Sequence, residues 1–329
     1  MKEIPSQSLD DAIEKVVKEV KAYQSKIVLY CSLKVFLENH GFRVLVENRC
    51  ERVGKDPDEP DLQAHGEKVT FIEEKSSLPD DRKLLEKEIR DVMDYHCEHL
   101  YRGAKFIPEV VLLCPSEVYR TRRAEFRKHE KNLVVLTYPF PVEDPIKIQL
   151  MQGSISDSVL QSITKTGTII VDLARTIIPT VKFLKQTPPV PYSAWTIWQV
   201  VWASVPPFKE DYSVRYTTIL KECQKFYPSW ISQDTEQITM GRVNEALELL
   251  QYVGWVEYEG KPTPQATIQI HYTKGDKIRK ETFHFLARKY VELKRRKNRP
   301  ERHAKVGVAR VKKPVPTPQD GRITDFISP

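Results

Sequence analysis

Residues 59–75 hold the feature that most constrains this chain, which is a pair of short strand-like runs separated by a turn that contains Gly66. Two such runs joined by a glycine-containing turn predict a β-hairpin. Successive side chains of a strand point to opposite faces, so Glu73 and Lys75, two residues apart, point the same way. The hairpin therefore predicts a sheet edge where a carboxylate and an ammonium share one face.

The turn also predicts which residues of the two strands face each other. Symmetric closure about Glu67 pairs His65 with Val69 and Asp61 with Glu73. Two carboxylates and a lysine ammonium then converge at one end of a sheet. Carboxylate oxygens and waters are the ligands that a hard divalent cation such as Mg²⁺ prefers. A neighbouring lysine can orient an attacking water and offset charge on phosphate oxygens.

The motif Pro60-Asp61, followed by Glu73-Glu74-Lys75, resembles the signature of the PD-(D/E)XK nuclease superfamily. The resemblance implies that Asp61 and Glu73 are metal ligands for Mg²⁺ or Mn²⁺ and that Lys75 is catalytic together with them. It implies a metal-dependent deoxyribonuclease of DNA repair, replication or recombination. The fold it implies is α/β, a restriction-endonuclease-like mixed sheet flanked by helices.

The predicted elements around the motif follow the αβββαβ order of that superfamily over roughly residues 10–140. A helical pattern over 9–23 precedes them. The predicted elements that follow this order are a helix over 25–40, a strand over 42–47, the motif hairpin, a charged helix over 80–100, a strand over 110–114, a basic helix over 116–131 and a strand over 133–138.

Two positions depart from the family pattern. The middle residue of the E-x-K motif is often apolar in the family, but here it is Glu74. Many members also carry a glutamate on the first helix, whereas residues 27–32 contain no acid, and Glu14 and Glu19 lie further upstream. These departures leave an alternative open, which is a one-metal site or a non-catalytic DNA-binding adaptor or regulator that retains the nuclease fold.

Composition predicts a soluble globular protein. The 329 residues are enough for two or three domains, and 40% of them are apolar and 29% charged. No run approaches 18 consecutive apolar residues, and residues 1–5 lack a signal-peptide pattern. We therefore expect no membrane partner and an intracellular location.

The cysteines favour the same compartment. They are Cys31, Cys50, Cys97, Cys114 and Cys223. Their number is odd and none forms a C-x-x-C pair, so a disulfide framework or a zinc ribbon is not expected. His96, Cys97 and His99 lie close together, but they do not share one face of the helix expected over 80–100. An ordinary helix surface is favoured over a metal site there.

The positive charge of the chain is concentrated near its C-terminus. Residues 288–313 hold twelve Lys or Arg and two Glu, a net charge of +10, and the whole chain carries +7, so the remainder carries −3. A segment of this kind is typical of an arm that binds the phosphates of DNA. The basic helix end within it consists of Lys294, Arg295, Arg296 and Lys297.

A proline-rich linker over 187–191 precedes a second domain that resembles a winged helix. The predicted elements are helices over 192–205, 216–227 and 239–253 and strands over 255–258 and 266–273. Three tryptophans, Trp195, Trp198 and Trp202, form a stripe on the first helix. We interpret this stripe as core packing, with a base-stacking platform as the alternative.

The winged-helix resemblance implies DNA-binding residues. The helix over 239–253 is the candidate recognition helix and offers Arg242 and Asn244, and the wing offers Lys261. The alternative is a module for protein docking or homodimer formation.

The last ten residues resemble the motif that binds the sliding clamp (PCNA). Ile323 takes its aliphatic position, Phe326 and Ile327 take its paired bulky positions, and Asp320 stands where the motif has glutamine. The resemblance implies recruitment by a sliding clamp, and with it the cytoplasm of an archaeon or the nucleus of a eukaryote. The alternative is that this tail docks on the body of the chain.

These observations divide the chain into four parts. They are a nuclease-like domain over 1–145, a connecting segment over 146–191 with a helix expected at 168–184, a winged-helix-like domain with a basic C-terminal helix over 192–298, and a disordered basic tail over 299–329.

Overall fold

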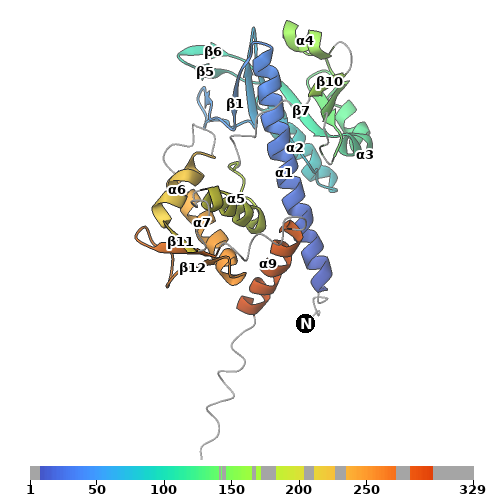
Figure 1. Cartoon of the computed structure of the whole chain (residues 1–329). Coiled ribbons are helices and arrows are strands. Elements are labelled where there is room, and N and C mark those ends of the chain that lie inside the picture. The colour runs from blue at the N-terminus through green and yellow to red at the C-terminus, as the bar shows by residue number, and fades with distance from the viewer. Residues whose placement is uncertain are drawn as a thin grey trace, which may run out of the picture.

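The structure is a computed structural model that describes residues 8–140, 142, 146–164, 168–171, 183–203, 211–226, 235–271 and 282–298. A large mixed sheet forms its N-terminal part, and a helical unit with a smaller sheet follows (Figure 1). Both contribute to one hydrophobic cluster, which runs from Val20 on the first helix to Leu286 on the last.

The large sheet has seven strands in the order β1-β3-β4-β7-β8-β9-β10. They are β1 (Arg43–Val46), β3 (Leu62–His65), β4 (Val69–Glu74), β7 (Glu109–Pro115), β8 (Val134–Tyr138), β9 (Ile146–Gln152) and β10 (Thr168–Val171). Strands β4, β7 and β8 run parallel, and the other neighbouring pairs are antiparallel. Strand β7 is covered on both faces, which explains why its sequence is a continuous apolar run.

Helices cover both faces of this sheet. They are α1 (Leu9–Asn39), α2 (Arg82–Met93), α3 (Ser116–Arg127) and α4 (Ser158–Thr164). Side chains alternate along β7, so Val111 and Leu113 pack in the cluster that contains α1. Val110, Leu112 and Cys114 point the other way and pack with α2 and α3.

Helix α1 is one continuous helix of 31 residues, where the sequence pattern predicted two. It begins at the N-cap Ser8, whose side chain accepts a hydrogen bond of 3.0 Å from the N–H of Asp11. No glycine or proline interrupts it before Gly41, which adopts a φ of +89° just beyond its end. The N-terminal half of α1 lies beside α9, the last helix (Figure 1).

A second, small sheet has the order β2-β5-β6 and consists of β2 (Glu51–Arg52), β5 (His99–Tyr101) and β6 (Ala104–Phe106). Arg102 and Gly103 both have positive φ and form the two-residue turn between β5 and β6. The helix expected over 80–100 is therefore wrong beyond Met93, because the chain turns there to form β5.

The C-terminal unit contains α5 (Val190–Ala203), β11 (Asp211–Arg215), α6 (Tyr216–Gln224), α7 (Thr235–Tyr252), β12 (Val256–Glu257), β13 (Thr267–His271) and α9 (Thr282–Asn298). Its sheet has the order β11-β13-β12. Trp198 is buried against Trp255, and Trp195 packs on Phe283, as expected for core packing. The side chain of Trp202 lies outside the described residues.

Residues 146–171 differ from the expected connecting segment. Strands β9 and β10 extend the large sheet beyond β8, so the sheet continues past residue 145. The expected helix over 168–184 is wrong at its start, where β10 pairs with β9, and residues 172–182 lie outside the described residues. The expected clamp-binding tail, with Asp320, Ile323, Phe326 and Ile327, lies outside them too. Within the described ranges, no helix is long and apolar enough to span a membrane.

Candidate active site

The motif hairpin closes with the expected register. His65 pairs with Val69 and Leu62 pairs with Ile72. Asp61 directly precedes β3, and its backbone N–H donates a hydrogen bond of 3.3 Å to Oε2 of Glu73. The hairpin thus brings Asp61 and Glu73 together at the end of β3 and β4.

Asp61 is held from two further directions. Its Oδ2 accepts a hydrogen bond of 2.7 Å from the backbone N–H of Glu74. Its Oδ1 lies 3.4 Å from the ammonium of Lys26, which α1 contributes. The carboxylate therefore has a defined orientation between the strand end and the first helix.

Glu73 and Lys75 share a face, as the strand parity predicts. The ammonium of Lys75 lies 3.3 Å from Oε1 of Glu73 and 3.2 Å from Oε2 of Glu88 on α2. Burial alone would lower the pKa of Lys75, but the neighbouring carboxylates Glu73 and Glu88 outweigh it and raise that pKa. The lysine is thus a charged ammonium, fixed between the motif strand and α2.

Glu74 points to the opposite side of β4, toward α1. Its Oε1 accepts a hydrogen bond of 2.5 Å from the Tyr138 hydroxyl, and its Oε2 lies 3.5 Å from the ammonium of Lys26. Burial raises the pKa of Glu74, and Lys26 opposes that shift. The acidic middle residue of E-x-K is therefore accommodated by a partner on β8 and another on α1.

Glu47 is a further carboxylate at this edge, and the sequence pattern did not single it out as a site residue. It follows β1 directly and is buried, with a φ of +46°, which is uncommon for a residue other than glycine. Its backbone N–H bonds the carbonyl of Asp61 at 2.8 Å, and its Oε2 accepts 2.6 Å from the N–H of Lys185. The only local signal was an acid at a strand end.

The cluster of acids raises proton affinity at the site. Burial and the nearby charge of Asp61 raise the pKa of Glu73 to about 7, against the opposing effect of Lys75. Burial, and to a smaller extent Asp61, also raise the pKa of Glu47 to about 7, although the hydrogen bond from Lys185 opposes this. Buried carboxylates that repel one another in this way are stabilised by a bound cation.

Lys26 supplies a second ammonium at the site, beside Asp61 and Glu74. Burial lowers its pKa, but the attraction of Asp61 and Glu74 outweighs that effect and raises it. It lies one residue before the stretch 27–32, in which the sequence lacks the acid that many family members carry. Where many members of that family carry an acid on the first helix, this chain places the ammonium of Lys26 on its first helix, α1.

The compact metal-ligand group of the structure lies elsewhere. Across the described part of the chain, one group of three His, Cys, Asp or Glu residues brings its ligand atoms within 4.8 Å of one another. It consists of Asp58, Cys97 and His99 and includes neither Asp61 nor Glu73.

The candidate DNA-binding residues differ in their surroundings. Arg242 on α7 is buried, and its guanidinium donates to the carbonyls of Leu184, Lys185 and Gln186, so its observed role is structural. Asn244 is half-buried and accepts a hydrogen bond from the Tyr216 hydroxyl. The exposed candidates are Lys261 between β12 and β13 and, at the end of α9, Lys294, Arg295, Arg296 and Lys297.

Comparison of the chain with models of protein families, with curated proteins and with solved structures finds no match. The case for a function therefore depends on the geometry of the residues themselves.

Proposed function

We propose that this protein is a metal-dependent deoxyribonuclease of the PD-(D/E)XK type. The observation that carries the proposal is that Asp61, Glu73 and Lys75 lie next to one another at one strand end, where the Asp61 N–H bonds the Glu73 carboxylate and Glu73 pairs with Lys75. A phosphodiester-cleaving site of this kind needs carboxylates for a divalent cation and a cationic group for the phosphate. The hairpin supplies both from residues that are at most 14 positions apart in sequence.

The carboxylates fit a hard divalent cation. Asp61 and Glu73 would hold it, with Glu47 close by, because their burial and mutual repulsion favour a positive charge among them. When bound, Mg²⁺ or Mn²⁺ supplies Lewis-acid activation of water and neutralises phosphate charge. The ammonium of Lys75 would contact a phosphate oxygen or the attacking water, and Glu88 would hold that ammonium in position.

The topology supports the same class. The order α1-β1-β3-β4-α2-β7, with an antiparallel motif hairpin and a parallel crossover from β4 to β7, resembles the core of the nuclease superfamily. The order α5-β11-α6-α7-β12-β13, with β11 paired to β13, resembles a winged helix. Such modules commonly contact DNA.

A DNA contact outside the site is supported by the end of α9. Its four consecutive basic residues, 294–297, are exposed. The chain beyond residue 298 carries further basic residues, and phosphate contacts by such a segment supply affinity that depends on salt. We propose that this arm holds DNA and that the C-terminal motif recruits the protein to a sliding clamp.

A specific observation favours a second candidate, a non-catalytic adaptor with the nuclease fold. Lys26 forms ion pairs with both Asp61 and Glu74, so an ammonium already neutralises part of the acidic cluster. In an adaptor, this internal cation would replace the metal permanently.

A cleavage assay distinguishes the two candidates. The full-length protein is incubated with duplex, single-stranded and branched DNA in Mg²⁺, in Mn²⁺ and in chelator. Cleavage that requires the divalent ion and is lost in Asp61→Asn supports the nuclease. DNA binding without cleavage of any of these substrates in either ion would support the adaptor.

A further inference from the structure

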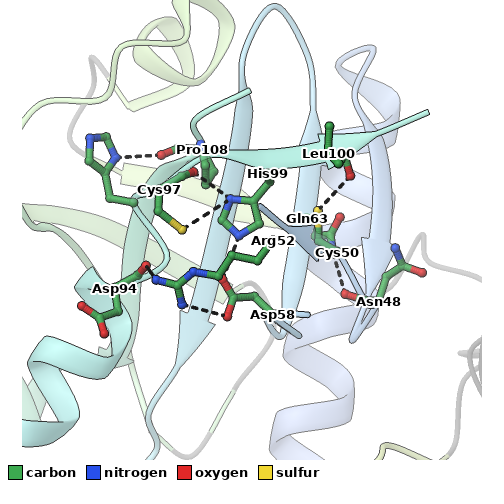
Figure 2. Close-up of polar contacts among 11 residues, drawn as sticks. Asn48, Cys50, Arg52, Asp58, Gln63, Asp94, Cys97, His99, Leu100 and Pro108 are labelled. Atoms are coloured by element: carbon green, nitrogen blue, oxygen red, sulfur yellow. Dashed lines mark hydrogen bonds and ion pairs between the residues drawn. The ribbon is translucent and has the colours of Figure 1, made fainter. Parts of the chain in front are cut away.

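Three residues beside the candidate active site form a cluster that the nuclease proposal does not use. Asp58 precedes β3, and Cys97 and His99 lie in the turn between α2 and β5 and at the start of β5 (Figure 2). Their ligand atoms lie within 4.8 Å of one another. The cluster exists because α2 ends at Met93 and the chain folds back toward the loop that carries Asp58.

His99 is fully buried and both of its ring nitrogens face oxygen atoms. Nδ1 lies 2.8 Å from the carbonyl oxygen of Cys97, and Nε2 lies 2.8 Å from Oδ2 of Asp58. A neutral imidazole has one N–H, so it can donate to only one of these acceptors. The other nitrogen then faces an oxygen atom with its lone pair, and the two repel each other. Either an additional proton or a metal ion has to bind there to remove this repulsion.

The arrangement matches that of histidines that bind metals. Such a histidine usually donates one ring N–H to a backbone carbonyl or a carboxylate, which fixes the tautomer, and coordinates the ion through the other nitrogen. Here Nδ1–H would donate to the carbonyl of Cys97, which leaves the lone pair of Nε2 on the side of Asp58 (Figure 2). The Cys97 thiol sulfur lies 4.0 Å from Nδ1 of the same ring, so it would have to turn toward Nε2 to share an ion with it.

We propose that Asp58, Cys97 and His99 form a binding site for Zn²⁺ or a similar transition-metal ion, with water as the fourth ligand. Thiolate, imidazole and carboxylate together are a donor set that zinc takes. The ligand atoms of a tetrahedral zinc site lie roughly 3.3–3.8 Å apart, as bond lengths of about 2.0–2.3 Å require. Binding would therefore move Nε2 of His99 and Oδ2 of Asp58, which lie 2.8 Å apart, away from each other and would turn the Cys97 thiol toward Nε2.

The surroundings of the cluster suit this role. Phe71 and Phe106 pack on the His99 ring and hold it in place. Asp58 and Cys97 are partly exposed, and an open hollow lined by Arg52 and residues 54–58 gives access from solvent. Arg52 lies 3.4 Å from Oδ1 of Asp58 and also donates to the carbonyl of Asp94, so Oδ2 of Asp58 is the oxygen that faces His99.

The proposed ion would stabilise the approach to the candidate active site. Asp58 lies three residues before Asp61, and its backbone N–H and C=O both bond to Cys50 beside β2. A metal that joins Asp58 to the α2–β5 turn would connect this segment to the small sheet. Its role is structural, and it is separate from the cation proposed at Asp61 and Glu73.

Cobalt substitution tests the site directly. The full-length protein is stripped with chelator and titrated with Co²⁺ in excess Mg²⁺, which occupies carboxylate sites. We expect intense tetrahedral bands and a thiolate charge-transfer band in the near ultraviolet, both displaced by Zn²⁺. Asp61→Asn should keep these bands, because its carboxylate belongs to the other site.

Variants assign the ligands. Cys97→Ser should abolish the charge-transfer band and weaken Zn²⁺ binding by at least tenfold, the lower end of the effect that even outer-shell partners have. Matched controls are His96→Gln, a nearby histidine that bonds the carbonyl of Pro108, and Cys31→Ser, a thiol on α1. Both should retain the bands.

Two results would overturn the proposal. One is a wild-type protein without a thiolate band. The other is Zn²⁺ affinity that is equal in wild type and Cys97→Ser. In either case the contact between His99 and Asp58 would be a hydrogen bond without a metal ion. Because Cys97 is partly exposed, its serine variant should fold, and circular dichroism checks that it does.

Discussion

The ammonium of Lys26 lies 3.4 Å from Oδ1 of Asp61, so helix α1 contributes a positive charge to the carboxylate that begins the motif. The same ammonium contacts Glu74, and it is largely buried. Removing one partner of a buried ion pair leaves the others without compensation, which is costly. A substitution of Lys26 therefore tests whether its ammonium stabilises the fold by neutralising the buried carboxylates or serves catalysis.

We predict that Lys26→Ala lowers the free energy of unfolding by about 1–3 kcal/mol at pH 8, somewhat less than a fully buried pair would lose. Mg²⁺ should raise the free energy of unfolding of the variant more than that of the wild type, because the cation replaces the positive charge that the variant lacks. Denaturant titrations with and without Mg²⁺ measure both effects. Lys21→Ala, an exposed lysine on the same helix, should change little. Equal effects of Mg²⁺ on variant and wild type would contradict the prediction.

The catalytic prediction concerns the three motif residues. Asp61→Asn, Glu73→Gln and Lys75→Ala should each reduce metal-dependent cleavage by ~10²-fold or more, because the two carboxylates hold the cation and the ammonium acts on the reacting phosphate. DNA affinity, measured by fluorescence anisotropy, should stay within a few-fold of the wild type. Lys105→Ala removes a surface ion pair with Glu98 and is the control. Full activity of any one motif variant would exclude that residue from the chemistry.

The pH dependence of stability follows from two raised pKa values. Glu73 and Glu47 both have a pKa of about 7 in the folded protein, above that of an unfolded glutamate. The folded state therefore binds protons more tightly, and the stability contributed by each group is present below pH 4.5 and is lost as the pH rises through about 7. We expect a loss of roughly 1–3 kcal/mol for each group between these limits.

Substitution by glutamine isolates this effect. Glu73→Gln or Glu47→Gln should flatten the pH profile of unfolding between pH 5 and 8, and each should be more stable than the wild type at pH 8 in chelator. Urea denaturation at several pH values measures the profile. A variant profile parallel to that of the wild type would show that the carboxylate ionises normally in the folded protein.

Arg242 should matter for folding and not for DNA. Its guanidinium donates to three carbonyls of the segment 184–186, and Lys185 of that segment donates its N–H to Glu47. Arg242→Ala should cost about 2–4 kcal/mol, because buried carbonyls lose a charged donor. Thermal unfolding measures this loss, with the exposed Lys261→Ala as the control. A stable Arg242→Ala variant with weakened DNA binding would instead favour direct contact.

The clamp prediction concerns residues beyond the described part of the chain. A peptide spanning 316–329 should bind a sliding clamp through Ile323, Phe326 and Ile327, with little dependence on salt because the contact is apolar. Phe326→Ala should cost about 2 kcal/mol or more, as loss of a buried aromatic anchor does. Titration of labelled peptide with clamp measures it. Absence of binding, with lower thermal stability of a protein truncated at 315, would favour docking of the tail on its own chain.

Much of the candidate site is predictable from residues close in sequence. The pairing of His65 with Val69 depends on the turn, and the shared face of Glu73 and Lys75 depends on strand parity. The burial of Trp198 follows similarly from helical periodicity. These features are local, because a turn and a strand set their geometry within a few residues.

Other features depended on where distant elements packed. Nothing in the sequence around Lys26 or Glu47 indicates that they meet Asp61, since α1 and β1 reach it only through the assembled sheet. The end of α2 at Met93, which brings Cys97 and His99 to Asp58, overrode a helical pattern that continued to residue 100. The sequence by itself therefore determined the motif hairpin and the periodic faces. The tertiary structure decided which charges surround the motif, because burial and long-range contacts exist only after the helices have packed on the sheet.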